Sequence, residues 1–150
     1  MRETLFNWLG QDLTGKRCLD LFAGSGALGM EAASRGAAEV VMIEKNRAVY
    51  SALLENIRKL EFHNIALRSE DGLNFVLRSN EQFDVIFLDP PFQSDYLEML
   101  LPHLANQLNP EGMLYIESGK QFVAAAPWQM LKSGKAGAGY YQLRQLEQHD

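Results

Sequence analysis

The stretch that most constrains the fold is Phe83–Phe92, which reads FDVIFLDPPF. It begins as an apolar run and ends in an aspartate, two prolines and a phenylalanine. A short apolar run bounded by turn signals is typical of a strand buried on both faces, as in a parallel sheet. Neither proline has an N–H to donate, so the sheet ladder cannot continue through them. The pattern predicts a central strand whose carboxyl end carries a stiff loop formed by Asp89, Pro90, Pro91 and Phe92.

This loop is a candidate ligand site. In open α/β sheets, ligands bind at the carboxyl ends of the strands. A carboxylate, a rigid carbonyl and an aromatic ring on one short loop can hold a flat group that bears an N–H. A simpler interpretation is a strand followed by a turn in which Asp89 caps the next helix.

Strand and helix patterns alternate along most of the chain, which implies a doubly wound, mostly parallel α/β sheet with right-handed crossovers. Each expected strand is an apolar run, and each expected helix shows apolar residues at helical spacing. The expected strands are Lys16–Phe22, Glu39–Ile43, Ile65–Arg68, Phe83–Leu88 and Met113–Glu117. The expected helices are Arg2–Leu9, Ala27–Arg35, Arg47–Leu60, Leu73–Arg78 and Leu97–Gln107, the last stopping at Asn109–Gly112.

The C-terminal part of the chain follows another pattern. Trp128–Lys132 and Tyr140–Leu146 look like two strands joined by the glycine-rich segment Ser133–Gly139. This arrangement predicts an antiparallel hairpin, which brings the sheet to seven strands. An α/β sheet that ends in a hairpin differs from the plain dinucleotide-binding fold.

Length and composition limit the class of protein. A chain of 150 residues with 47% hydrophobic content is the size of one globular domain, expected to span residues 1–150. One cysteine and three scattered histidines provide neither a disulfide framework nor a metal cluster. With no apolar segment of roughly eighteen residues and no signal peptide, we expect a cytoplasmic protein that contacts no membrane. The net charge of −5 argues against a broad basic surface for nucleic acid, although a local one stays open.

A glycine-rich loop follows the first strand, in the segment DLFAGSGALG. Gly24, Gly26 and Gly29 match the G-x-G-x-x-G fingerprint of dinucleotide sites, which is a weak signal by itself. Glu44 lies about twenty residues further on, where an acidic residue binds a ribose diol. At this point NAD and other nucleoside ligands are equally compatible with the loop.

Asp20 favours a cationic ligand, because a carboxylate just before the loop would repel a pyrophosphate. S-adenosylmethionine has an ammonium, a sulfonium and a ribose that Glu44 can bind. Asp71 follows the third strand, where it or its neighbouring backbone can accept a hydrogen bond from the adenine amino group. The competing roles are a loop hydrogen bond for Asp20 and helix N-capping for Glu44 and Asp71.

These motifs carry a family resemblance. DLFAGSG, Glu44 and DPPF resemble the motifs of class I S-adenosylmethionine-dependent methyltransferases, which have a Rossmann-like sheet. DPPF is similar to the [DN]PP[FY] signature of enzymes that methylate exocyclic amines of nucleobases. More narrowly, RETLFNWL, CLDLFAGSGALGMEAASRGA and FDVIFLDPPF are similar to the bacterial guanine-N2 methyltransferases of small-subunit (16S) ribosomal RNA. The resemblance extends from Arg2 to about Arg144.

The resemblance implies methyl transfer from S-adenosylmethionine, leaving S-adenosylhomocysteine, to a guanine N2 amine in ribosomal RNA or the small ribosomal subunit. It implies a monomer without a metal. Members of this family extend further upstream with a basic hairpin, so we expect a catalytic core that lacks an N-terminal RNA-binding extension. The resemblance assigns catalysis to Asp89, Pro90, Pro91 and Phe92. It assigns cofactor binding to Asp20, Phe22, Gly24, Ser25, Gly26, Glu44, Lys45, Asp71 and Gly72.

In the expected mechanism, Asp89 and the Pro90 carbonyl accept the two amine hydrogens, so that the nitrogen lone pair turns toward the methyl group. Phe92 stacks on the base. An NAD-dependent oxidoreductase would leave the DPPF loop without a role. Two more functions stay open. The chain could be a cofactor-binding core without turnover, or a DNA adenine-N6 methyltransferase, although it has no inserted target-recognition domain.

Overall fold

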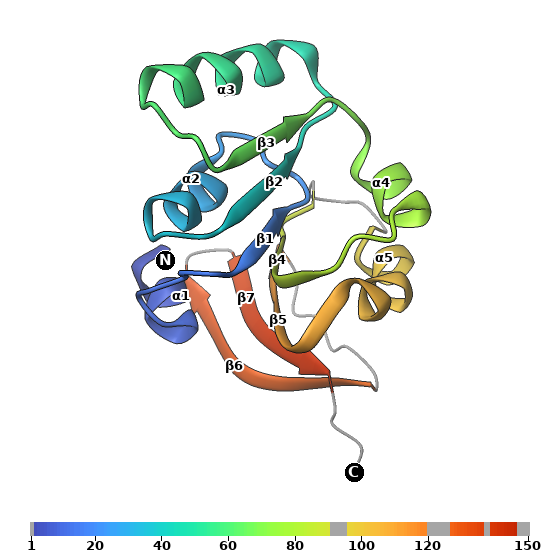
Figure 1. Ribbon diagram of the computed structural model, residues 1–150. Coiled ribbons are helices and arrows are strands. Elements are labelled where there is room, and N and C mark those ends of the chain that lie inside the picture. The colour runs from blue at the N-terminus through green and yellow to red at the C-terminus, as the bar shows by residue number, and fades with distance from the viewer. Residues whose placement is uncertain (1, 91–95, 120–126, 137–138, 147–150) are drawn as a thin grey trace.

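A seven-stranded sheet crosses the structure, with helices on both of its faces (Figure 1). This computed structural model describes residues 2–90, 96–119, 127–136 and 139–146. The strands are β1 (Arg17–Asp20), β2 (Glu39–Ile43), β3 (Ile65–Arg68), β4 (Phe83–Leu88), β5 (Leu108–Ser118), β6 (Trp128–Ala136) and β7 (Gly139–Leu146). The helices are α1 (Arg2–Leu9), α2 (Ala27–Ser34), α3 (Arg47–Lys59), α4 (Gly72–Arg78) and α5 (Tyr96–Leu104), followed by a 3₁₀ turn at Ala105–Gln107.

The strand order is β3-β2-β1-β4-β5-β7-β6. The first five strands pair in parallel, β7 pairs antiparallel with β5, and β6 pairs antiparallel with β7. The predicted fold class, a doubly wound and mostly parallel sheet finished by an antiparallel hairpin, is therefore confirmed.

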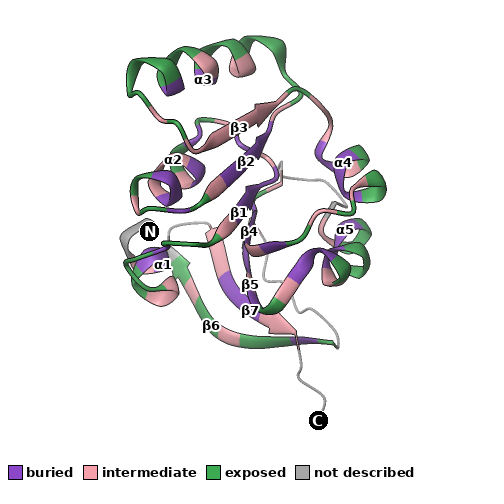
Figure 2. Cartoon of the chain, viewed as in Figure 1, coloured by how far each residue is buried: buried purple, intermediate pink, exposed green. Residues whose placement is uncertain are grey.

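Each face of the sheet carries its own hydrophobic core, because successive side chains of a strand point to opposite faces. Cys18 and Phe87 lie on the face covered by α1, α2 and α3. Leu19 and Ile86 lie on the opposite face, where α4 and α5 pack (Figure 1). The central strands and the helix sides that face them are buried, whereas the outer side of α3 is exposed (Figure 2).

The predicted boundary between the last helix and the fifth strand is wrong. The expected helix Leu97–Gln107 ends at Leu104, after which the chain makes a 3₁₀ turn. The strand begins at Leu108 rather than at Met113, because the register with β4 shifts and accommodates Asn109–Gly112 as a bulge. Proline and glycine within this segment indicated a turn, but such residues also mark bulges.

The predicted hairpin loop Ser133–Gly139 is also wrong in extent. β6 continues to Ala136 and β7 begins at Gly139. Gly134 pairs with Tyr141, and a Cβ at Gly134 would lie 2.6 Å from the ring of that tyrosine. The glycine that suggested a loop instead allows an aromatic side chain to lie across a strand.

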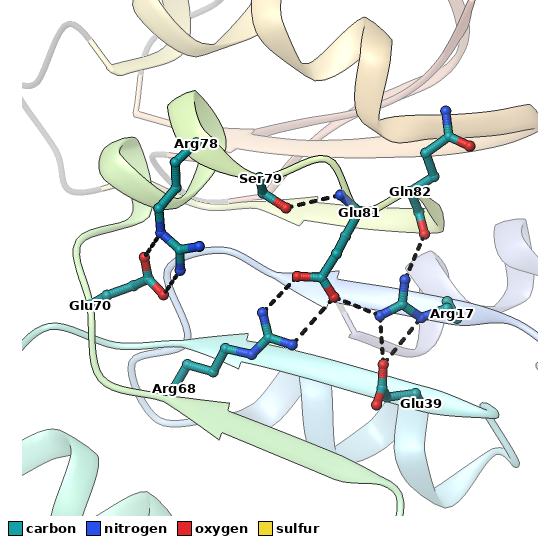
Figure 3. Close-up of polar contacts among 8 residues, drawn as sticks. All are labelled: Arg17, Glu39, Arg68, Glu70, Arg78, Ser79, Glu81 and Gln82. Atoms are coloured by element: carbon teal, nitrogen blue, oxygen red, sulfur yellow. Dashed lines mark hydrogen bonds and ion pairs between the residues drawn. The ribbon is translucent and has the colours of Figure 1, made fainter.

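An ion-pair network ties the first three strands to the segment before β4 (Figure 3). The Arg17 guanidinium lies 2.6 Å from a Glu39 oxygen and 2.9 Å from a Glu81 oxygen. Arg68 lies 2.7 Å from the other oxygen of Glu81. The hydrogen bonds from Arg68, and then from Arg17, outweigh the effect of burial and lower the pKa of Glu81 to about 2.

Candidate active site

A cavity of about 540 Å³ opens at the carboxyl edge of β1, β2, β4 and β5. Its volume is within the range of small-molecule sites, and its position is the one at which open α/β sheets bind ligands. Two of the four catalytic candidates, Asp89 and Pro90, line it, whereas Pro91 and Phe92 lie outside the described residues. Seven of the nine cofactor candidates line it: Asp20, Phe22, Gly24, Ser25, Glu44, Lys45 and Gly72.

Asp20 is a buried carboxyl group on the cavity wall. It ends β1, two residues earlier than the predicted end of that strand at Phe22. Its Oδ2 accepts a hydrogen bond of 3.1 Å from the Gly29 backbone N–H, in the first turn of α2. Burial, reinforced by Asp89 and Glu44, raises its pKa to about 7. Because burial makes this carboxyl group costly to ionise in the absence of a ligand, it is suited to binding a cationic ligand.

The glycines of the loop allow α2 to approach β1 closely. Gly26 precedes α2 at a φ of 81°, and a Cβ there would lie 2.5 Å from a Leu53 methyl group. A Cβ at Gly29 would lie 2.9 Å from the Asp20 carboxyl oxygen and 2.9 Å from the Met42 sulfur. Gly26 does not line the cavity, so its position indicates a role in shaping the loop rather than a direct contact.

Glu44 connects the glycine loop to the end of β2. Its Oε1 accepts from the Gly24 N–H at 3.0 Å, and its Oε2 accepts from the Asn46 N–H at 2.9 Å. Helix α3 is capped by Asn46, whose side chain accepts from the Val49 N–H, so the competing role of Glu44 as that cap is wrong. A carboxylate has about four acceptor positions, so Glu44 retains capacity for a diol.

Asp71 and Gly72, which follow β3, have different roles at the cavity. The Asp71 side chain caps α4, accepting from the Leu73 N–H at 3.0 Å, and does not line the cavity. Gly72 does line it, and a Cβ there would lie 3.0 Å from both the Leu21 carbonyl and the Phe22 ring. At this position the structure presents backbone, rather than a carboxylate, to the cavity.

Asp89 lines the cavity and comes directly after β4. Its side chain reaches solvent, yet the protein atoms around the carboxyl group, and then the charge of Glu117, raise its pKa to about 6. Glu117 accepts a hydrogen bond of 3.0 Å from the Tyr115 hydroxyl. A carboxyl group with a raised pKa accepts a proton more readily than an ordinary aspartate.

Several lining residues were not predicted. Glu117 ends a predicted strand at the same sheet edge, so the rule that selected Asp20 and Asp89 would also have indicated it. Tyr115 looks like a core residue and is 1% exposed. Glu70 is held by Arg78 (Figure 3), a contact with no local sequence signal. The apolar part of the lining is Leu21, Ala23, Ala27, Leu28 and Ile43.

The lining is strongly acidic, which favours a cationic ligand over a pyrophosphate. Lys45 is the one basic side chain among the described lining residues. Within the described ranges, no group of histidine, cysteine or acidic residues is arranged to hold a metal ion, and no helix is long and apolar enough to cross a membrane. The acidic lining residues are Asp20, Glu44, Glu70, Asp89 and Glu117.

Comparisons with known proteins agree on a family. A family model described as conserved hypothetical protein 95 matches residues 1–145. The chain is 37% identical to ribosomal RNA small subunit methyltransferase D of Escherichia coli, over 98% of this chain and 77% of that protein. The protein of the same name from Haemophilus influenzae is also 37% identical, over 97% of this chain and 79% of the relative.

Solved structures share the fold. The yhhF protein of Escherichia coli has a TM-score of 0.90 at 37% identity, covering 99% of this chain and 85% of that one. Ribosomal protein L11 methylase of Lactobacillus delbrueckii, at 18% identity and a TM-score of 0.78, has the same Rossmann-like methyltransferase fold. The chain therefore belongs to the family described as conserved hypothetical protein 95, together with the bacterial relatives named ribosomal RNA small subunit methyltransferase D.

Proposed function

We propose that this protein transfers the methyl group of S-adenosylmethionine to the exocyclic N2 amine of a guanine in small-subunit ribosomal RNA. The observation that carries the proposal is the acid-lined cavity in which Asp20, Glu44 and Asp89 meet at one sheet edge. The names of the relatives support ribosomal RNA as the substrate. The DPPF sequence supports an exocyclic amine as the acceptor.

The residues present fit S-adenosylmethionine, which supplies an activated methyl group on a positively charged sulfur. The buried Asp20 carboxyl group suits the positive end of this molecule. Glu44 suits its ribose, and the cavity-lining backbone at Gly72, beside Asp71, suits its adenine. Gly24 and Ser25 provide a loop that can approach the ligand closely, Gly26 shapes this loop, and Phe22 and Lys45 complete the proposed cofactor site.

Asp89 and Pro90 are proposed to activate the amine. The nitrogen of an exocyclic amine is a poor nucleophile, because its lone pair is delocalised into the ring. When the Asp89 carboxylate and the Pro90 carbonyl accept its two hydrogens, the lone pair can turn out of the ring plane. Asp89, whose pKa is raised to about 6, can then take the proton that the methylated nitrogen releases.

Positioning is expected to supply most of the rate enhancement. Holding two reactants in near-attack geometry can remove roughly 7–11 kcal/mol of the barrier. We propose that Pro91 stiffens the loop and that Phe92 stacks on the base, a contact worth about 1–3 kcal/mol in other nucleic-acid complexes. The base must leave its stack, at a cost of a few kcal/mol that is smallest for an unpaired nucleotide.

An Asp89→Ala variant tests the role of this carboxylate. We expect methyl transfer to fall by at least about 100-fold, the contribution of a positioned acid–base group, while the dissociation constant for S-adenosylmethionine changes less than about threefold. Methyl transfer is measured with labelled methyl groups on ribosomal RNA and on small subunits, and the dissociation constant is measured by isothermal titration calorimetry. Glu98→Ala, on the exposed side of α5, is the matched control.

Three results would contradict the proposal. Parallel loss of cofactor affinity and transfer would make Asp89 a cofactor ligand. Cofactor binding by the wild-type protein without transfer to RNA or to small subunits would indicate a core that does not turn over. Methylation of duplex DNA at adenine, with none on RNA, would indicate the wrong substrate class.

A further inference from the structure

We propose that Glu117 makes the site specific for guanine by accepting a hydrogen bond from the ring N1–H beside the amine that is methylated. This inference rests on the proposed function and names the group that reads the base. Glu117 lines the cavity at the end of β5 and was not among the residues expected from the sequence.

The sheet register places Glu117 beside Asp89. β4 and β5 pair Phe87 with Tyr115 and Leu88 with Ile116 in parallel, and Asp89 and Glu117 come directly after this last pair. Side chains two residues apart on a strand point to the same face. Phe87 and Tyr115 lie on the face covered by α1 and α2, so we expect Asp89 and Glu117 to project from that face at adjacent positions.

The strand order separates a cofactor side of the cavity from a substrate side. Glu44 follows β2, Asp89 follows β4 and Glu117 is the next-to-last residue of β5. Because the order is β2-β1-β4-β5, Asp89 lies between the other two carboxylates along the sheet edge. With the ribose at Glu44 and the reacting amine at Asp89, the base ring extends toward Glu117.

Tyr115 fixes one oxygen of Glu117 and leaves the other available. The Tyr115 hydroxyl donates to Oε2 of Glu117 at 3.0 Å, and burial, followed by the Glu117 charge, raises the pKa of this tyrosine. The hydroxyl therefore remains a donor at physiological pH. No other hydrogen bond to Glu117 comes from the residues that the structure describes, so Oε1 is free to accept from a substrate.

A carboxylate oxygen at this place distinguishes the bases by their edges. Guanine has an N1–H donor next to its amine, whereas adenine and cytosine have a bare ring nitrogen next to theirs. A carboxylate only accepts hydrogen bonds, so it pairs with guanine and repels the lone pair of the other two bases. Sites that hydrogen-bond a substrate donor can reject an analogue without it by about 10⁴–10⁵.

RNA containing 2-aminopurine tests this assignment, because 2-aminopurine keeps the C2 amine but has no N1–H. Mass spectrometry first locates the guanosine that the wild-type protein methylates, and matched RNAs then carry guanine or 2-aminopurine there. For the wild-type protein we expect kcat/KM on 2-aminopurine to be at least about 100-fold lower than on guanine. For Glu117→Gln, whose amide can donate to N1, we expect the two values to come within about tenfold.

Further variants distinguish a change in base specificity from a general loss of activity. Glu98→Gln, an equal charge change on exposed α5, is expected to keep the wild-type preference. Tyr115→Phe keeps the Glu117 carboxylate without the bond that orients it, so an intermediate preference is expected. The affinity of Glu117→Gln and of Tyr115→Phe for S-adenosylmethionine, measured by titration, is expected to stay within about threefold of the wild-type value.

Equal wild-type activity on guanine and 2-aminopurine would overturn the inference while leaving the proposed function intact. The inference would also be overturned if Glu117→Gln lowered the activities on guanine and on 2-aminopurine in the same proportion. Absence of wild-type transfer to any guanosine would instead overturn the proposed function, and the inference with it.

Discussion

Replacing Asp20 by asparagine is expected to stabilise the ligand-free protein while weakening its binding of S-adenosylmethionine. Asp20 is 3% exposed, and its Oδ2 accepts from the Gly29 N–H. Asparagine has nearly the same size and retains an oxygen that can accept this bond, but it carries no charge. We therefore predict that the charge of Asp20 favours binding of the ligand and lowers the stability of the ligand-free protein.

The magnitude follows from the pKa of Asp20, which burial raises from 3.8 to about 7 against the opposing effect of the Gly29 hydrogen bond. Between these two pH values the folded chain holds a proton that the unfolded chain has released. The contribution of Asp20 to the free energy of unfolding therefore decreases as the pH rises from 4 to 7. A pKa difference of this size corresponds to about 4 kcal/mol above pH 7, or a rise of about 8–16 °C in the Tm of the variant.

Urea denaturation between pH 4 and pH 8 measures this effect in the absence of ligand. The stability gain of Asp20→Asn is expected to be largest at pH 8 and to shrink to less than about 1 kcal/mol at pH 4, where the folded wild-type carboxyl group is protonated and the unfolded one is only partly ionised. Glu55→Gln, which removes the same charge from the exposed side of α3, is the control. Affinity for S-adenosylmethionine is expected to fall at least about tenfold, as for a lost charged contact. A variant no more stable than wild type at pH 8, or a gain independent of pH, would contradict the prediction that the buried charge of Asp20 destabilises the ligand-free protein.

Two further predictions concern packing and charge. Glu81→Gln is expected to lower the free energy of unfolding by about 1 kcal/mol at pH 7, since its ion pairs with Arg17 and Arg68 are partly exposed. The pKa of Glu81 is depressed from 4.5 to about 2, so this difference is expected to vanish in urea titrations as the pH falls through that window. Gly29→Ala places a Cβ 2.9 Å from the Asp20 oxygen and the Met42 sulfur, so thermal denaturation is expected to show a loss of about 1–3 kcal/mol. An unchanged Tm would contradict the close approach of α2.

The sheet could be predicted from the sequence because its parallel strands are buried on both faces and read as apolar runs. Phe83–Leu88 has the bounds that the sequence predicted. The bulge at Asn109–Gly112 and the pairing of Gly134 with Tyr141 depend on contacts between strands that are distant in sequence. Local turn signals cannot distinguish such pairing from a loop, which is why both boundaries were misplaced.

The candidate site was predictable where a polar residue ends a strand, as at Asp20 and Asp89. It was less predictable where a helix boundary decides which atoms face the cavity. Because α4 begins at Gly72, the Asp71 side chain is used as its cap, and backbone rather than a carboxylate lines the wall. The contribution of Tyr115 depends on the register of β4 with β5, which no local pattern contains.

A crystal structure of the protein with S-adenosylhomocysteine would show directly whether the cofactor lies in the acid-lined cavity. We predict that the ribose hydroxyls lie on Glu44, the amino-acid end lies near Asp20, and the sulfur faces Asp89 across the cavity. A ligand bound elsewhere, or an Asp89 carboxyl group turned away from the sulfur, would contradict it.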